Sequence, residues 1–149
     1  MPIRTSLLLF VLPLIAAAPA PFEHWSAATL KSYDEKFAGQ GVATQQLGSY
    51  PLQTAVVRHR EASAGAEAHQ HAADWLVIQT GAGTLLLGGT IANAKTESPG
   101  ELRGEAIVGG TRQSLAPGDI VFVPAGTPHQ FLLEKGQKIT YFALKVQGQ

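Results

Sequence analysis

The amino-acid sequence predicts an all-β domain of the sandwich or barrel class over residues 42–149, preceded by one short helix. From Val42 onward, helical spacing of apolar residues gives way to alternation. Short apolar runs are separated by turn signals such as Gly-Gly, Pro-Gly and Lys-Gly, which is typical of sandwiches and barrels. The predicted strands are Thr54–Arg60, Trp75–Thr80, Gly83–Leu87, Ala106–Val108, Thr111–Leu115, Asp119–Val123, Gln130–Leu133 and Lys138–Val146.

Composition limits the kinds of site that this domain can carry. The 149 residues, 45% of them apolar, are enough for one domain with a hydrophobic core. The formal net charge is zero, so the composition gives no indication of the basic patch that binding to nucleic acid or to an anionic membrane surface requires. Cysteine is absent, which excludes disulfides, thiolate ligands and a thiol nucleophile. Histidine and carboxylate are the remaining metal-ligating side chains.

Residues 1–20 have the pattern of a bacterial secretory signal peptide. A single positive charge at Arg4 precedes a short apolar run over Leu7–Ala18, and small residues follow at Ala16–Ala20. The run is shorter than the roughly 20 apolar residues that span a bilayer, so we expect no stable membrane insertion. A buried N-terminal helix is the alternative. We expect a periplasmic or secreted protein whose mature chain starts between residues 17 and 22.

Residues 21–41 are predicted to form a short helical segment. The helix is expected over Phe22–Phe37 with Ser26 as its N-cap, and Gly39 and Gly41 end it. Its apolar stripe is more typical of a face packed on the domain than of a binding site, and it comprises Trp25, Leu30, Tyr33 and Phe37.

The predicted strand Thr54–Arg60 alternates basic and apolar residues. Arg58 and Arg60 share one face, Val57 and His59 share the other, and one of these faces is expected to meet solvent. For His59 we favour a partly exposed or hydrogen-bonded strand residue over a ligand.

A polar, turn-rich excursion runs between Thr90 and Thr111. Loops of this length are uncommon unless they are disordered or functional. The segment Glu101–Gly104 could cover the mouth of a pocket and supply Arg103 to an anionic group. A solvated hairpin without a ligand role is the other interpretation.

Upstream of the predicted strand at Trp75 lies a cluster of imidazoles and carboxylates. In an extended chain Glu67, His69 and His71 point to the same side, and Asp74 follows where the next strand begins. Imidazole and carboxylate together favour iron, manganese, zinc, copper or nickel over calcium or magnesium. The cluster therefore predicts a site for a divalent transition metal.

Downstream, the segment Gly118–His129 (GDIVFVPAGTPH) places another histidine at a strand start. Pro117-Gly118 forms a tight turn that launches the apolar strand ending at Val123. The segment Pro124–Pro128 ends that strand, because neither proline can donate to a β-ladder. A closed barrel could bring His129 to the upstream cluster.

These residues resemble the cupins, a superfamily of small β-barrels, over roughly residues 54–146. The second cupin motif, G-x5-P-x-G-x2-H, is matched at Gly118, Pro124, Gly126 and His129, with Leu133 at the usual asparagine position. The first motif, G-x5-H-x-H-x3,4-E-x6-G, is matched at His69, His71 and Gly81. Counted back from Gly81, its glutamate position is Asp74. Counted forward from His71, the spacer is one residue short, and the opening Gly65 lies too close to His69.

The resemblance implies a jelly-roll-like barrel and a metal held by His69, His71, His129 and Asp74. Aspartate is shorter than glutamate, so Asp74 could ligate, orient a histidine or do neither, and Glu67 is the alternative carboxylate. Without a carboxylate, a three-histidine site like that of the thiol-dioxygenase cupins remains. Cupin-like barrels that have lost the metal but kept the turn of the second motif are the competing interpretation.

Two functions are consistent with these features. The first is an exported metalloenzyme acting on a small polar molecule, for which the resemblance suggests dioxygenase or isomerase chemistry. The second is a non-catalytic module that binds a sugar or carboxylate without metal, using Trp75, Arg103 and the histidines. A third, less favoured interpretation is an interaction domain whose helix mediates assembly. The resemblance is also compatible with a homodimer.

Overall fold

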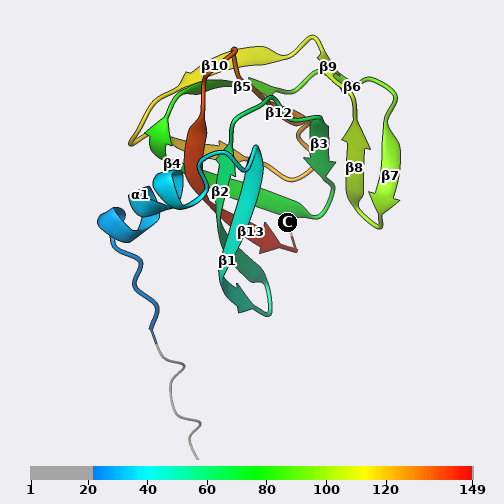
Figure 1. The fold of residues 1–149 in the computed structure, drawn as a ribbon. Helices are drawn as coiled ribbons and strands as arrows, with labels where there is room; N and C mark the ends of the chain where they lie inside the picture. The colour runs from blue at the N-terminus through cyan, green and yellow to red at the C-terminus, as the bar shows by residue number, and fades with distance from the viewer. Residues whose placement is uncertain (1–21, 149) are drawn as a thin grey trace, which may run out of the picture.

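The computed structural model describes residues 22–148, which form two antiparallel sheets and one helix (Figure 1). The first sheet contains, in spatial order, β1 (Val42–Tyr50), β2 (Gln53–Arg60), β13 (Ile139–Gln147), β4 (Ala72–Gly81) and β11 (Ile120–Val123). The second contains β10 (Thr111–Leu115), β5 (Gly83–Leu87), β12 (His129–Leu132), β3 (Ala66–His69), β8 (Glu101–Gly104) and β7 (Lys95–Ser98). A short pair joins β6 (Thr90–Ile91) to β9 (Ile107–Val108). The all-β, jelly-roll-like prediction is confirmed.

The predicted signal peptide lies outside the described residues. Within residues 22–148, no helix is both long and apolar enough to cross a membrane.

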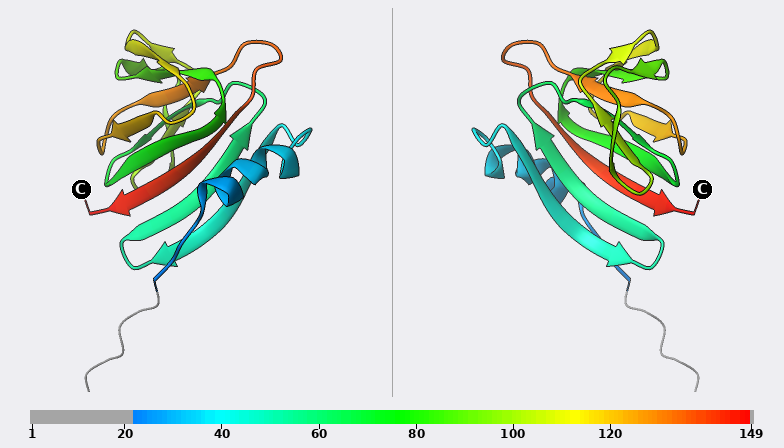
Figure 2. Two further views of the ribbon diagram at one scale, coloured as in Figure 1. Left: turned by 90° about the vertical axis from the view of Figure 1, so that its left-hand side faces the viewer. Right: turned by 90° about the vertical axis from the view of Figure 1, so that its right-hand side faces the viewer.

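The helix α1 (Ala27–Lys36) covers the outer face of the first sheet, with β2 and β13 beneath it and the second sheet on their other side (Figure 2). Ser26 is its N-cap, and its hydroxyl accepts a hydrogen bond from the Thr29 amide at 3.1 Å. Asp34 fastens the helix to β13 and the loop before it, because its carboxylate accepts bonds from the ammonium of Lys138 and the hydroxyl of Thr140.

In its second half, the strand β2 has no fully solvent-exposed face. His59 is fully buried between α1 and the sheet, where Nδ1 lies 2.8 Å from the hydroxyl of Thr140. Arg58 and Arg60, on the opposite face, point into the barrel, where Arg58 lines a cavity and Arg60 is buried. The expected solvated face is therefore absent, because helix and barrel cover the two sides of this strand.

The excursion between Thr90 and Thr111 is more ordered than the sequence suggested. Its strands β7 and β8 form a hairpin that turns at Gly100, and β8 pairs with β3. The pairing places Arg103 opposite Glu67 and Glu101 opposite His69. The segment is thus a hairpin, as the second interpretation expected, and it extends the second sheet.

The space between the sheets is apolar at one end and polar at the other. The apolar core contains Leu76, Ile78, Leu85, Leu115, Val123, Phe131, Ile139, Tyr141 and Ala143. Four of these residues, Leu76, Phe131, Tyr141 and Ala143, also line the cavity that opens toward the polar end. The hydrophobic core therefore forms the floor of the candidate site.

Candidate metal centre

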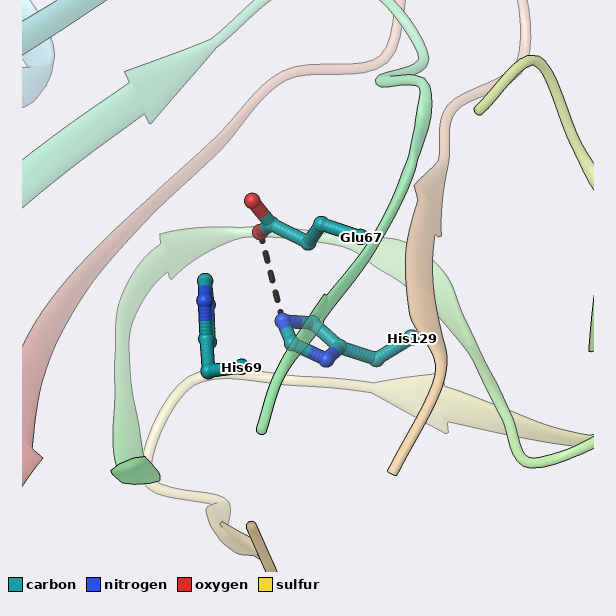
Figure 3. Close-up of side chains that lie close together, drawn as sticks. All are labelled: Glu67, His69 and His129. Carbon is teal, nitrogen blue, oxygen red and sulfur yellow. Dashed lines mark ion pairs between the residues drawn. The ribbon is translucent and has the colours of Figure 1, made fainter. Parts of the chain in front are cut away.

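Four side chains from three strands converge at the polar end of the barrel. Ligand atoms of Glu67, His69 and His129 lie within 4.8 Å of one another (Figure 3). Nε2 of His129 lies 3.2 Å from Glu67 Oε1 and 3.7 Å from Asp74 Oδ2. The same Asp74 oxygen lies 3.2 Å from Nε2 of His69. Two imidazole nitrogens thus face two carboxylates.

Strand alternation explains why Glu67 and His69 point the same way. Both lie on β3, where residues two apart share a face. Asp74 comes from the other sheet, on β4, and is only 7% exposed. The chain crosses from one sheet to the other through the turn at Gln70 and His71.

His71 does not join this group. It lies on the exposed turn between β3 and β4, and its ring packs near Gly100 at the tip of the β7–β8 hairpin. The alternation that grouped His71 with His69 requires an extended chain, but the chain turns there. The structure brings together Glu67, His69, Asp74 and His129, and it leaves His71 outside.

This arrangement also places the first motif in a different register. Glu67 and His69 occupy the two positions of H-x-H, followed after four residues by Asp74 and after six more by Gly81. Both spacers then match the motif, with glutamate replacing the first histidine and aspartate replacing glutamate. The spacing defect counted from His71 disappears.

The turn of the second motif is attached directly to β3. Gly126 has φ of 76°, and its amide donates to the His69 carbonyl at 2.7 Å. Glycine adopts this left-handed conformation without the steric penalty of a Cβ. Three residues later, His129 begins β12 with its ring directed at the cluster. The motif thus builds the turn and positions the histidine.

The outer nitrogen of each imidazole has a hydrogen-bond acceptor. Nδ1 of His129 lies 3.1 Å from the Thr127 carbonyl, and Nδ1 of His69 lies 2.6 Å from Glu101 Oε2. A carbonyl or carboxylate only accepts, so Nδ1 of His129 carries the proton. Nδ1 of His69 also lies 3.1 Å from the Lys145 ammonium, and the shorter contact to the Glu101 carboxylate assigns a proton to this nitrogen as well. Both Nε2 atoms are then left to face the carboxylates. Metal-ligating histidines in proteins are commonly oriented by such contacts.

Arg103 binds the cluster from the hairpin side. Its guanidinium pairs with the Glu67 carboxylate and reaches Glu101 at 3.3 Å and Glu97 at 3.1 Å. It therefore holds a candidate ligand and does not line the cavity that Glu67 shares with His69 and His129. Trp75, which the sequence suggested for substrate binding, is 44% exposed on β4 and packs against Phe122.

The electrostatics of the metal-free cluster favour an ion pair between ionised Glu67 and protonated His129. Burial opposes the charge of Glu67, but the hydrogen bond and charge of His129, with the charge of Arg103, hold its pKa well below 4.5. Burial also opposes the charge of His129, yet the bond to Glu67 and that carboxylate's charge raise its pKa above 6.5. A cation at this position is stabilised by the surrounding carboxylates.

The donor set fits a divalent transition metal by the same reasoning. With both Nδ1 atoms protonated, neutral His69 and His129 offer Nε2 lone pairs, and Glu67 and Asp74 offer oxygen lone pairs. Four inward-facing acceptors need a cation between them. Mixed imidazole and carboxylate ligation suits iron, manganese, zinc, copper or nickel.

Beside the cluster lies a cavity of about 190 Å³. Its walls come from the inner faces of both sheets, and its lining comprises the four cluster residues and Thr54, Val56, Arg58, Leu76, Phe131, Tyr141, Ala143 and Lys145. Pockets for drug-sized ligands measure roughly 300–1,000 Å³, so this cavity suits a small molecule.

Sequence reasoning missed Glu101, Arg58 and Lys145. Glu101 reaches His69 only through the pairing of β8 with β3, a contact between distant segments that no local signal marks. Arg58 and Lys145 were detectable in part, because alternation places each on the same face as an apolar neighbour two residues away. The sequence did not indicate which face of these strands lines the barrel interior.

Comparison with known proteins shows which folds this structure resembles. A family model described as the AraC-like ligand binding domain matches residues 103–149. A search of curated proteins found no match. A Klebsiella pneumoniae protein with a double-stranded β-helix domain is 14% identical, with a TM-score of 0.57 over 86% of this chain and 92% of its own.

Two further solved structures match over less of their length. A cupin 2 conserved barrel domain protein from Rhodopseudomonas palustris is 22% identical, with a TM-score of 0.51 over 70% of this chain. The DMSP lyase DddQ from Ruegeria pomeroyi is 20% identical, also with a TM-score of 0.51 over 70% of this chain. This chain spans 60% and 46% of their respective lengths, so the likeness concerns the fold. Together with the two facing sheets, these findings show that the chain has a cupin-like fold.

Proposed function

We propose that this protein is a metal-binding cupin that holds a divalent transition metal with Glu67, His69, Asp74 and His129. The observation that carries the proposal is the convergence of their four acceptor atoms while both Nδ1 atoms are bonded elsewhere. Two carboxylates supply two negative charges, which balance a divalent ion in a partly buried site.

The proposed activity is chemistry on a small polar molecule in the adjacent cavity, of the dioxygenase or isomerase kind. A bound metal of this class supplies Lewis acidity or, for iron, manganese or copper, oxygen activation. The protein's own contribution is orientation and exclusion of water. Val56, Leu76 and Phe131 line the cavity with apolar surface, and Glu101 and Arg103 hold two of the ligands in place.

Elemental analysis of untagged protein tests the metal site. We expect about one equivalent of iron, manganese, zinc, copper or nickel in the wild type. His69→Ala and His129→Ala should lose it, and Asp74→Ala and Glu67→Gln should weaken it. His71→Ala is the matched control, because this histidine lies two residues from His69 but outside the cluster. A wild type that stays empty after incubation with these metals would overturn the proposal.

A non-catalytic binding module is the second candidate, favoured by the mixture of apolar wall and cationic side chains in the cavity. The two candidates differ in their dependence on metal. Turnover of any substrate that is abolished in metal-stripped protein and restored by metal supports the enzyme. Ligand binding that is unchanged by stripping supports the module.

Export and homodimer formation complete the proposal and rest on sequence. The signal-like pattern over residues 1–20 supports a periplasmic or secreted protein. Cell fractionation with N-terminal sequencing tests export, and a mature chain that still begins at Met1 would contradict it. Light scattering of the mature protein gives the oligomeric state.

A further inference from the structure

The wall of the cavity opposite β3 and β12 is graded along the strands. At one end Arg58 on β2 pairs in register with Tyr141 on β13. Next come the apolar residues Val56 and Ala143, and the polar Thr54 and Lys145 follow. The cavity therefore has a cationic end, an apolar middle and a polar end beside Asp74, which pairs in register with Lys145.

One nitrogen of the Arg58 guanidinium has no partner among residues 22–148. This nitrogen, Nε, is buried without a hydrogen bond. Among the described residues, no carboxylate forms an ion pair with Arg58. Arg58 as a whole is partly exposed, but a buried N–H without an acceptor still costs free energy. This side chain lines the cavity, so the missing partner can come from a ligand.

Tyr141 offers a second donor at the same end. Its hydroxyl oxygen accepts a bond from Arg60 Nε at 3.0 Å, and the tyrosine lines the cavity. Because that oxygen already accepts a bond, its own hydrogen is available to donate to a ligand acceptor. Guanidinium and phenol hydroxyl together can bind an oxyanion.

Charge balance also favours an anion. A divalent metal would neutralise Glu67 and Asp74, and the remaining contacts of Arg103 are to Glu97 and Glu101 on its own hairpin. Arg58 would then stay uncompensated inside the barrel. The cavity is small and partly apolar, which suits a planar carboxylate on a short carbon chain.

We propose that the cavity binds a short-chain carboxylate. Arg58 and Tyr141 hold its carboxylate group, and a polar group at the other end of the molecule points toward the four-residue cluster. This inference deepens the proposed function and rests on it for the role of the cluster. It names Arg58 and Tyr141 as the residues that select the substrate class. No covalent step is involved.

The test measures binding of carboxylates of two to six carbons to metal-loaded protein by calorimetry, each beside its neutral primary amide. Wild type should bind at least one carboxylate more tightly than its amide. Arg58→Gln should weaken that binding roughly 10- to 100-fold, as expected for the loss of a charge-assisted bond. Arg58→Lys should restore part of it. Arg112→Gln, at an exposed arginine on β10, is the matched control and should bind as wild type does.

Metal content measured on the same samples separates the two proposals. Arg58→Gln should retain the metal, because Arg58 is not a candidate ligand. Protein that binds metal but does not prefer carboxylates to amides overturns the carboxylate site and leaves the metal proposal standing. Protein that prefers carboxylates to amides but binds no metal overturns the metal proposal and leaves the carboxylate site standing. Tighter binding of inorganic phosphate than of every carboxylate also overturns the assignment.

A spectroscopic readout covers an Arg58→Gln variant that fails to fold. The Nε–H resonance of Arg58 in the wild type should shift on addition of the carboxylate and stay unchanged on addition of the amide. A resonance that responds to neither, while a carboxylate binds, would place the ligand elsewhere and overturn the proposal.

Discussion

Oε2 of Glu101 lies 2.6 Å from Nδ1 of His69, so the β7–β8 hairpin supports the candidate metal centre. The carboxylate also lies 3.5 Å from Lys145 Nζ and 3.3 Å from the Arg103 guanidinium. Two cations thus fix the carboxylate that orients the imidazole. The β7–β8 hairpin, which lies in a polar, turn-rich part of the sequence, therefore supports the candidate metal ligand His69.

Glu101→Gln should weaken metal binding without abolishing it. The amide keeps the shape of the side chain but removes the charge that holds Nδ1–H, and changes of this kind typically lower metal affinity about 10- to 100-fold. Competition with a chelator measures the effect. Glu105→Gln, in the same excursion but on the exposed surface, is the control. Equal affinities in the two variants would contradict the supporting role of Glu101.

Metal affinity should fall as the pH falls through neutrality. The Glu67 carboxylate raises the pKa of His129 above 6.5 against the effect of burial, so metal must displace a proton from this imidazole below that raised pKa. Each displaced proton lowers the apparent affinity about tenfold per pH unit. Chelator competition between about pH 6 and 9 gives the slope. An affinity independent of pH over this interval would exclude proton displacement from His129.

Without metal, the pair of Glu67 and His129 should make stability depend on pH in two directions. The raised pKa of His129 adds stability that is full below pH 6.5 and is lost as the pH rises through the folded value. The lowered pKa of Glu67 adds stability that is present above pH 4.5 and is lost as the pH falls through its folded value.

The contribution of this pair is therefore greatest between pH 4.5 and 6.5. Urea unfolding of metal-stripped protein across that range measures it, with His129→Gln as the comparison. A variant whose stability follows the same pH profile as wild type would show that the pair contributes nothing.

The sequence predicted what depends on local chemistry. Proline and glycine at fixed places in the segment Gly118–His129 specify the turn, and alternation specifies most of the strands. It did not predict β1, whose polar run VATQQLGSY is only partly buried at the edge of its sheet. Edge strands carry a weak hydrophobic pattern, because one side of the ladder and often one face meet solvent.

The errors around the site have a geometric cause. His71 was grouped with His69 because the turn at residues 70 and 71 contains neither glycine nor proline, so nothing marked the end of the strand. The partners of Glu67 and His69 on β8 depend on pairing between segments more than 30 residues apart. Such pairing follows from the whole fold and leaves no trace in a short window of sequence.

Gly126→Ala should reduce both stability and metal affinity. The residue has φ of 76°, and a Cβ there meets no atom within 4 Å, so the cost is that of the left-handed backbone alone, roughly 1–2 kcal/mol. Relaxation of the turn should also stretch its bond to the His69 carbonyl and shift His129 three residues later. Gly39→Ala is the matched control, because Gly39 has φ of 77° and equal space but lies beyond α1, away from the cluster. Urea unfolding should show similar losses in both variants, whereas chelator competition should show weaker metal binding only for Gly126→Ala. Equal metal affinities would mean that the turn does not position the ligand.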